Sequence, residues 1–496
     1  MMKQKSPAAI IGCGLGGLAT ACRLAFLGHP VTLFEKNDGP GGKMQEIRKD
    51  GYRFDTGPSL LTMADVLNEL FESCGEKPGD YLTLLEPEPL CRYLYPDGTR
   101  FDNFRNPGLS VAEIQRFAPE DADAYRQFLE YCQRLYIRTS GAFLFNPLYQ
   151  LRDLADLRLT DMCRIDAFRT VSSRIDREFH SPYLRQFFKR FTTYNGSSPF
   201  QAPATLNVIP HVELNQGGFY VKGGLFRIAE SLYRLAGKLG VKFRFQTGVQ
   251  KIRTSGNRVT GLLLENGTTF DSKLVISNSD ATETLTSLLG TPAVSTGKIQ
   301  RLKRAEPSSS GFVLLLGTDR NWDLLRHHTI FFSTDYRREF ADIFQRGILP
   351  HDPTIYIANT SHTDPSDAPE GGSNLFILVN APWVREGQDW NEIRESYTDK
   401  ILNMLDLKGL SGIRESIRFR QVITPVDFRR RFLSHRGSIY GRSSNSRLAA
   451  FLRPRNKVAE INGLYLTGGG SHPGGGIPLV LLSARHAVEL IRRHEQ

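Results

Sequence analysis

The chain has 496 residues, which is too long for one compact core, so two or three domains are expected. Its composition, 40% hydrophobic and 23% charged without low-complexity blocks or solenoid repeats, excludes a disordered or repeat protein. The formal net charge of +11 favours an anionic partner, and because no nucleic-acid-binding module is recognisable, an anionic lipid surface and a merely solvated basic face are the interpretations left open.

A strand, a glycine turn, a helix and a second strand are predicted at the N-terminus. Ala8–Ile11 is a short apolar run that ends in the turn 12–17, with the sequence GCGLGG. The next residues have the apolar spacing of a helix up to Gly28, and the apolar run Val31–Phe34 ends in the acid Glu35. This order of elements, with the acid 18 residues beyond the last glycine, is typical of a dinucleotide-binding unit.

The chemistry of a bound dinucleotide explains these residue types. Gly12 permits the tight turn, Gly14 allows a pyrophosphate to approach the backbone, and Gly17 allows the helix to pack closely on the strand. The helix N-terminus offers free N–H groups to the phosphates, and the carboxylate of Glu35 can accept hydrogen bonds from ribose hydroxyls. The cofactor-binding residues predicted in this unit are Gly12, Gly14, Leu15, Gly16, Gly17, Glu35 and Lys36.

A second glycine turn, Gly39–Lys43, follows the ribose acid and precedes the segment Phe54–Ser59. An NAD-only domain has no need of this turn, whereas the turn resembles the extended signature of FAD-binding flavin amine oxidases and their relatives. FAD is therefore the predicted cofactor, and two ordinary surface turns are the alternative. Asp55 is expected to be a structural turn acid rather than a base. The cofactor-binding residues predicted here are Gly41, Gly42, Lys43, Thr56, Gly57, Pro58 and Ser59.

Aromatic side chains are plentiful in the interior of the chain. Between residues 183 and 194 they recur at helical spacing, with Arg185, Lys189 and Arg190 on the opposite side. A helix that covers its own core and a helix that dips into a membrane at the mouth of a lipid tunnel both fit this pattern. Residues 131–149 are a second candidate of the same kind.

The stretch 211–290 is predicted to return to the cofactor domain. A helix is expected over Leu225–Leu239, and strands over Val241–Phe245 and Leu274–Ser277. Further on, Arg418–Arg455 contains ten arginines and one acid, which predicts a basic surface.

The C-terminal segment is predicted to close the cofactor site. The strand Leu464–Leu466 leads into residues 467–478, where six glycines occur among nine residues, and a helix then runs to about Arg493. Such a loop buries almost no apolar surface, so it suits backbone that lies flat against a large planar ligand. His472 either accepts a proton beside the flavin or hydrogen-bonds backbone. The cofactor-binding residues predicted here are Gly468, Gly469, Gly476, Ile477 and Pro478.

Several other features are not indicated by the sequence. The longest apolar runs fall short of the roughly 20 residues that span a bilayer. No signal peptide is expected, because its cleavage would destroy the N-terminal turn. No metal site is expected, and the six cysteines show neither CxxC pairing nor metal-type spacing with histidine. Reduced, packed thiols of a cytosolic protein are therefore predicted at positions 13, 22, 74, 91, 132 and 163.

Over essentially its whole length the chain resembles the bacterial carotenoid desaturases of the phytoene-desaturase type. The segments that carry the likeness are 470–478, Thr424–Phe428, Gly437–Gly441, Arg190–Pro199, Ala202–Leu206 and Gly217–Tyr220. The last three are more similar to the branch that acts late in the pathway, which includes 3,4-desaturases of hydroxylated carotenoids and oxidases of terminal methyl groups. By the same resemblance, Val249 is expected to hold the adenine through its backbone. Asn278, at the end of the predicted strand Leu274–Ser277, is also predicted to belong to the cofactor site.

The resemblance implies an α/β fold, with a glutathione-reductase-type Rossmann domain for FAD and an interleaved substrate domain of mixed sheet and helices. The FAD-binding domain is expected to comprise 1–65, 211–290 and 456–496. The substrate-binding, membrane-associating domain is expected to comprise 66–210 and 291–455. Pieces of the two domains therefore alternate along the chain.

The reaction implied by the resemblance is desaturation of a polyene, in which a hydride passes to the flavin, a proton is lost and a C=C bond forms. A late step such as 3,4-desaturation is the leading hypothesis. Terminal methyl oxidation and early phytoene desaturation are close alternatives, a flavin amine oxidase is a distant one, and a prenyl-protein carrier of the GDP-dissociation-inhibitor class is a non-enzyme alternative. Oxygen or quinone is the expected electron acceptor, and the cytoplasmic side of the membrane, as a peripheral protein, is the expected location.

Overall fold

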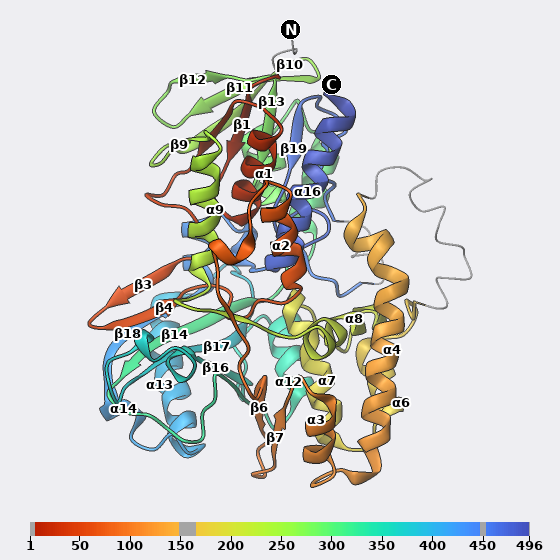
Figure 1. Ribbon diagram of the computed structural model, residues 1–496, viewed down its shortest axis with the longest axis vertical. Helices are drawn as coiled ribbons and strands as arrows, with labels where there is room; N and C mark the ends of the chain where they lie inside the picture. The colour runs from red at the N-terminus through yellow and green to blue at the C-terminus, as the bar shows by residue number, and fades with distance from the viewer. Residues whose placement is uncertain (1–4, 148–164, 447–452, 496) are drawn as a thin grey trace.

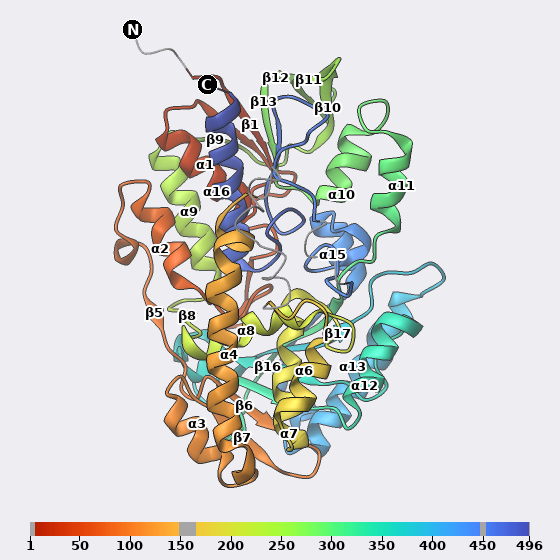
Figure 2. The ribbon, with the colours of Figure 1, turned by 90° about the vertical axis from the view of Figure 1, so that its right-hand side faces the viewer.

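The computed structural model describes residues 5–147, 165–446 and 453–495, which form two units stacked along the long axis (Figure 1). The upper unit in this view carries both chain ends, and the lower unit contains most of the second half of the chain (Figures 1 and 2). The site described below lies where the two units meet.

The upper unit is built on a parallel five-stranded sheet in the order β19-β13-β1-β2-β9. Its strands are β1 (Ala8–Ile11), β2 (Val31–Phe34), β9 (Lys242–Arg244), β13 (Leu274–Ser277) and β19 (Leu464–Leu466). The five predicted strands are confirmed, and β9 is shorter than predicted by one residue at each end. Because successive side chains of a strand point to opposite faces, Ala8 and Ile10 pack against helices, while Ala9 and Ile11 pack against a second sheet.

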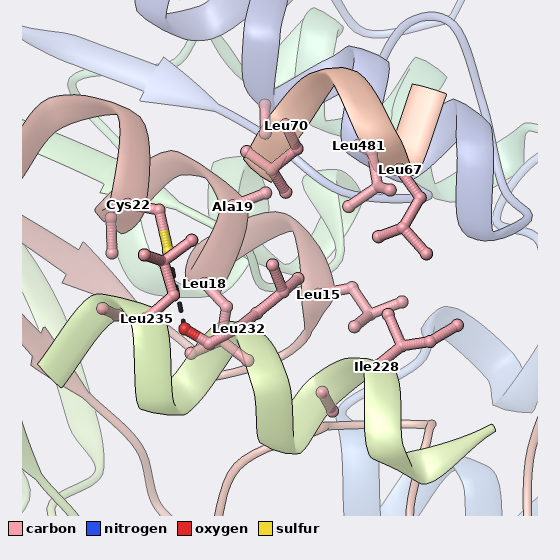
Figure 3. Close-up of a cluster of buried hydrophobic side chains, with 14 of the residues drawn as sticks. Leu15, Leu18, Ala19, Cys22, Leu67, Leu70, Ile228, Leu232, Leu235 and Leu481 are labelled. Atoms are coloured by element: carbon pink, nitrogen blue, oxygen red, sulfur yellow. Dashed lines mark hydrogen bonds between the residues drawn. The ribbon is translucent and has the colours of Figure 1, made fainter. Parts of the chain in front are cut away.

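Helices cover one face of this sheet. They are α1 (Leu15–Phe26), α9 (Phe226–Lys238) and α16 (Ile477–His494), with α2 (Ala64–Glu72) beside α16. Figure 3 shows α1 side chains such as Leu18 between Leu232 of α9 and the side chains of α2 and α16. The Cys22 thiol donates to Leu232 O over 3.5 Å, and burial raises its pKa. The prediction of free, buried cysteines is confirmed for five of the six, and Cys163 lies outside the described residues.

The other face of the parallel sheet is covered by an antiparallel three-stranded sheet. Its strands, in spatial order, are β10 (Val249–Ser255), β11 (Arg258–Leu264) and β12 (Thr269–Asp271). A parallel sheet between helices and a small antiparallel sheet is the predicted glutathione-reductase-type arrangement, so the α/β fold class is confirmed.

The lower unit is built on a seven-stranded sheet in the order β18-β14-β17-β16-β15-β6-β7. The sheet is mixed, because β15 pairs with β6 in parallel while the other pairs are antiparallel. Its strands are β6 (Cys91–Leu94), β7 (Arg100–Asn103), β14 (Ser310–Thr318), β15 (His328–Phe331), β16 (Ile355–Asn359), β17 (Ser373–Ala381) and β18 (Ile417–Ile423). These strands come from the two stretches expected to form the substrate domain, although the residue boundaries of the domains stay a prediction.

Alternate side chains of β14 pack into two different hydrophobic clusters. Phe312 and Leu314 pack towards α13 (Trp390–Leu407), whereas Val313 and Leu315 pack with Tyr52 at the junction with the upper unit. The remaining strands are β3 (Glu46–Lys49), β4 (Tyr52–Asp55), β5 (Leu84–Leu85) and β8 (Tyr220–Val221). Further helices are α10 (Ala281–Glu283), α11 (Thr296–Arg304), α12 (Tyr336–Ala341), α14 (Ile413–Ser416) and α15 (Pro425–Phe432).

Helices of the first half of the chain flank the lower sheet. They are α3 (Pro107–Ile114), α4 (Ala122–Ser140), α6 (Val171–Glu178), α7 (Pro182–Lys189) and the short α8 (Val208–Pro210), which lies beside α4 (Figure 1). Phe187 and Phe188 of α7 are fully buried, so this helix covers its own core. The predicted basic face is wrong for Arg190, which is only 6% exposed, because the helix gives way to a 3-10 turn at this residue and the guanidinium turns inward.

No helix within the described residues is long and apolar enough to cross a bilayer. The second aromatic candidate, 131–149, is observed as the end of α4 followed by a π-helical turn over Gly141–Phe145. Leu135 is buried, Ile137 is 68% exposed, and Leu148 lies outside the described residues.

Candidate functional site

A continuous cavity of about 570 Å³ runs along the junction between the two units. The cofactor-binding residues predicted from the sequence all line this cavity with the exception of Gly17, and His472 lines it as well. Both ends of the chain and segments of both units therefore meet around one space. The end lined by the glycine turns is called the cofactor end below, and the apolar end beside α4 and α8 is called the substrate end.

The two N-terminal glycine turns form the wall of the cofactor end. The Gly41 N–H donates to Cys13 O over 2.8 Å, so the turns lie directly against each other. A Cβ atom added at Gly14 would lie 2.9 Å from Asn278 Nδ2, and one added at Gly42 would lie 3.0 Å from Gly14 Cα. Because many of the lining residues here are glycines, the wall is largely bare backbone, which fits the close approach of a pyrophosphate.

Gly17 has a different role from the residues that line the cavity. A Cβ atom at this position would lie 2.1 Å from the carbonyl oxygen of Gly12. The absence of a side chain lets α1 pack against the end of β1, which is the packing role expected of the last glycine in the turn.

Two helix N-termini face the cavity. The first turn of α1 follows Gly14 and is fully described by the structure; it carries neither an acid nor a capping side chain. The same holds for α16, which follows Gly476 at φ +106° and has Pro478 at its second position. Both termini can therefore stabilise negative charge, as a pyrophosphate or a reduced flavin requires.

Glu35 is held rigidly at the end of β2. Its carboxylate accepts hydrogen bonds from Cys13 N at 2.7 Å, from Asn37 N at 2.9 Å and from Asn37 Nδ2 at 2.8 Å. The residue is 6% exposed and lines the cavity, so its remaining acceptor capacity is available to a hydroxyl donor bound there.

Lys43 connects the glycine turn to the lower unit. Its Nζ donates to Ile439 O over 2.7 Å, and burial lowers its pKa to about 8, an effect that the nearby Asp280 opposes. At neutral pH the ammonium group therefore remains charged and fits an anionic cofactor. Tyr440 follows Ile439 within the segment Gly437–Gly441, which carries part of the family likeness. Its Cδ1 would be 3.0 Å from a Cβ at Gly475.

His472 and His486 form a neutral pair beside the C-terminal loop. Their ring centroids are 5.6 Å apart, and the Nε2 atoms lie 3.3 Å from Asn146 O and 2.8 Å from Leu144 O, respectively. Burial lowers the pKa of His472 to about 3 and that of His486 to about 4, so both rings are uncharged at neutral pH. The backbone hydrogen bond of His472 is observed, and a role as proton acceptor stays a prediction. His486 was not predicted as a site residue, because nothing in the sequence of α16 distinguishes it from the other residues of the helix.

Asp55 is a structural acid, as expected. It accepts from Leu225 N at 3.1 Å and Phe226 N at 2.9 Å, where α9 begins, and from Arg53 Nη2 at 2.6 Å. Asp55 thus holds the N-terminus of α9 in place.

The substrate end of the cavity is lined mainly by apolar side chains. Phe143 and Leu144 come from the turn after α4, and Val208 and Val212 come from α8 and the turn that follows it. Val313 and Phe376 of the lower sheet complete the wall. A lipid substrate requires an apolar tunnel, but the sequence did not identify these lining residues individually, because they come from segments that are far apart along the chain.

The basic surface predicted over Arg418–Arg455 is only partly observed. Arg429 and Arg430 on α15 are exposed, but Arg453 is 8% exposed and lines the cavity. Its guanidinium is held inside because it donates to Tyr440 O and Arg442 O, at 3.3 and 3.2 Å. Arg447 lies outside the described residues.

Comparison with known proteins gives matches over nearly the whole chain. Residues 15–492 match the family model described as flavin containing amine oxidoreductase. The 1-hydroxycarotenoid 3,4-desaturase of Flavobacterium sp. (strain P99-3) is 37% identical over 494 residues, which is 98% of each chain. The 4,4'-diapolycopene oxygenase of Methylomonas sp. is 34% identical over 483 residues, which is 96% of each chain.

Solved structures show the same fold at low identity. Cyclohexylamine oxidase from Brevibacterium oxydans IH-35A is 15% identical with a TM-score of 0.62, covering 99% of this chain and 100% of the other. A Rab GDP-dissociation inhibitor from Plasmodium falciparum is 11% identical with a TM-score of 0.55, covering 98% of both chains. These likenesses show a shared fold alone.

Proposed function

The chain belongs to the family of flavin-containing amine oxidoreductases, and we propose that within this family it is an FAD-dependent carotenoid desaturase that acts at a late step, such as 3,4-desaturation. Oxidation of a terminal methyl group is the second candidate, because an oxygenase is nearly as similar to the chain as a desaturase. The observation that carries the proposal is the cavity itself. One continuous space joins a wall of bare backbone to an apolar wall.

The residues of the chain fit FAD at the cofactor end. Gly14, Gly42 and the N-terminus of α1 would hold the pyrophosphate, Glu35 the ribose, and the loop that ends at Gly476 the flavin. When bound there, FAD supplies the acceptor for a hydride removed from the substrate. The apolar wall beside Val208 excludes water and keeps the polyene in one orientation.

The lining of the substrate end favours a polyene over an amine. A cationic amine would need an unpaired carboxylate or an exposed aromatic cage. Glu213 is the carboxylate in this part of the described cavity wall, and Arg190 already pairs with it at 2.6 Å. A prenyl-protein carrier, which does not use FAD, would have no need of the bare backbone at Gly14 and Gly42.

We further propose that the protein docks on an anionic membrane, with oxygen or a quinone as the electron acceptor. The exposed Arg429 and Arg430 on α15 and the net charge of +11 support an electrostatic attraction to anionic lipid. Sedimentation with vesicles tests this proposal. We expect binding to vesicles that contain anionic lipid, weaker binding to R429Q/R430Q, and release by salt; equal binding to zwitterionic vesicles would contradict it.

Expression in carotenoid-producing bacteria tests the main proposal. Hosts that accumulate phytoene, neurosporene, lycopene or 1-hydroxylated carotenoids are compared, and pigments are separated by chromatography and identified by mass. A loss of two hydrogens per step is the expected result, and the accepted substrate identifies the step. A gain of oxygen would select the terminal oxidase instead. No change with any carotenoid, in a protein that holds FAD, would contradict both candidates.

A further inference from the structure

A buried ion pair lies at the substrate end of the cavity, outside the set of residues predicted to bind the cofactor. Arg190 Nη2 lies 2.6 Å from Glu213 Oε1, and the two side chains are 7% and 4% exposed. The Tyr194 hydroxyl donates to the second carboxylate oxygen, and the Tyr93 hydroxyl accepts from Arg190 Nη2. The carboxylate is therefore fixed in position.

The carboxylate side of this cluster faces the cavity. Glu213 and Tyr194 belong to the cavity lining, whereas Arg190 and Tyr93 do not. The neighbouring lining residues on the same segment include the apolar Val208, Ile209 and Val212. Among the described lining residues between 203 and 213, Glu213 is the charged one.

Stability alone gives no reason for this pair. Removing a buried carboxylate and a guanidinium from water carries a large desolvation penalty, and apolar residues of similar volume are often at least as stabilising. Glu213 also lies in a π-helical turn, His211–Asn215, a local geometry that is frequent at functional sites. These features point to a role in recognition.

The unused acceptor sites of the Glu213 carboxylate define which ligands it can bind. An ionised carboxylate has about four lone-pair sites and can only accept hydrogen bonds. Arg190 and Tyr194 each occupy one of these sites, so acceptor capacity remains on Glu213, which lines the cavity. Because Arg190 already balances the charge of Glu213, the carboxylate does not favour a cationic amine. A ligand that fits must carry a neutral O–H donor on an otherwise apolar chain, and a hydrocarbon or aldehyde end offers no such donor.

We propose that Glu213, positioned by Arg190 and Tyr194, accepts a hydrogen bond from a terminal hydroxyl group of the polyene substrate. The apolar wall contacts hydroxylated carotenoids and hydrocarbons of the same chain length equally, and only the hydroxylated carotenoid can donate to Glu213. The contact with Glu213 therefore selects the hydroxylated carotenoid. This inference rests on the proposed function, and it names the substrate class of that same site.

The test compares two substrates on the same FAD-loaded protein. A carotenoid with a terminal hydroxyl group and the hydrocarbon of equal length are supplied in detergent micelles, and kcat/KM and Kd are measured for each. The wild type is expected to prefer the hydroxylated substrate by at least about 10-fold. In R190M/E213L, which removes the whole pair and leaves no unpaired buried charge, the preference should fall by about 10- to 100-fold in both quantities.

A matched control separates recognition from stability. Arg92 and Asp102 form another buried pair, at 2.7 and 2.8 Å, on β6 and β7 away from the cavity lining. R92M/D102L should leave the preference for the hydroxylated substrate as it is. If R190M/E213L does not hold FAD, Y194F provides the same comparison with a smaller fall in preference.

Each outcome decides something. An unchanged preference in R190M/E213L or Y194F, or a wild type without preference for the hydroxylated substrate, overturns the role of Glu213. If neither carotenoid is turned over by the FAD-loaded protein, the proposed function fails, and the ratio of the two Kd values still decides whether Glu213 recognises a hydroxyl group.

Discussion

The two ends of the cavity are built in opposite ways. At the cofactor end the wall is backbone, and a Cβ atom at Gly14 or Gly42 would meet other atoms within 3.0 Å. At the substrate end the wall is made of side chains such as Phe143 and Val208, which come from separate segments. A backbone wall tolerates almost no substitution, whereas a side-chain wall can change one residue at a time. This difference fits a family in which desaturases and oxygenases share nearly the whole length of the chain.

The largest effect is expected at the cofactor end, from Gly14→Val. The new Cβ would lie 2.9 Å from Asn278 Nδ2, and the two methyl groups would fill the space beside the second glycine turn. We expect the affinity for FAD to fall by at least about 100-fold. The ratio of flavin to protein absorbance in the purified variant measures the loss.

Gly39→Ala is the matched control for this substitution. Gly39 lies in the second glycine turn, but a Cβ there would meet no atom within 4 Å, so the variant should bind FAD like the wild type. A Gly14→Val protein that retains stoichiometric flavin would contradict the backbone-wall description of the cofactor end.

The cofactor end was largely predictable because its signals are local. Buried parallel strands appear as continuous apolar runs, and the prediction of Leu274–Ser277 matches β13 residue for residue. The glycine spacing follows from a turn of six residues, so one short stretch specifies both the fold and its chemistry. All predicted cofactor residues except Gly17 line the cavity, although their contacts with FAD remain a prediction.

The substrate end could not be predicted in the same way, because its contacts join distant parts of the chain. Strand β6, Cys91–Leu94, pairs with β15, His328–Phe331, and nothing local in either segment specifies the other. The inward orientation of Arg190 depends on Glu213, 23 residues further on, in a segment that carries no periodic pattern. From the sequence, Arg190 beside an aromatic helix therefore suggested a basic surface. In the structure its guanidinium pairs with Glu213 and is buried.

Arg53 joins the two units, and its removal should destabilise the fold as a whole. It lies 2.6 Å from Asp55 and 3.3 Å from Asp367, and it is almost fully buried. Arg53→Met would leave buried carboxylates without a cation, so the free energy of unfolding should fall by about 3–5 kcal/mol. Urea unfolding followed by circular dichroism measures this change. Arg48→Met, in an exposed pair with Glu46, should cost less than about 1 kcal/mol, and equal losses in the two variants would contradict the junction role.

The two histidines beside the C-terminal loop should make the junction sensitive to acid. They hold the carbonyl groups of Leu144 and Asn146 at the substrate end to α16 and its loop. The pKa values of His472 and His486 are about 3 and 4 in the folded protein and near 6.5 in an unfolded chain. At a pH between the folded and the unfolded pKa, the unfolded state therefore binds more protons than the folded state. Stability should therefore fall as the pH is lowered, by about 2 kcal/mol per histidine between pH 7 and 5.

The variant His486→Gln isolates one of the two histidines. The glutamine amide can still donate to Leu144 O but does not titrate, so the loss of stability between pH 7 and 5 should be smaller than in the wild type by about 2 kcal/mol. Urea midpoints at the two pH values give the comparison, and His351→Gln at an exposed position is the control. An unchanged pH dependence in His486→Gln would show that His486 is not buried as a neutral group.

The smallest effect is expected from a change confined to the side-chain wall. Val208→Phe adds a ring to the substrate end, where an apolar polyene would lie, and leaves every glycine of the cofactor end in place. We expect KM for a given carotenoid to rise by at least about 10-fold, the lower end of the effect that one extra methylene group has in an apolar pocket. Flavin content and KM are measured on the same preparation. A loss of FAD together with the rise in KM would show that the two ends are not independent, and the tolerance of the side-chain wall could then not explain how one scaffold serves several carotenoid reactions.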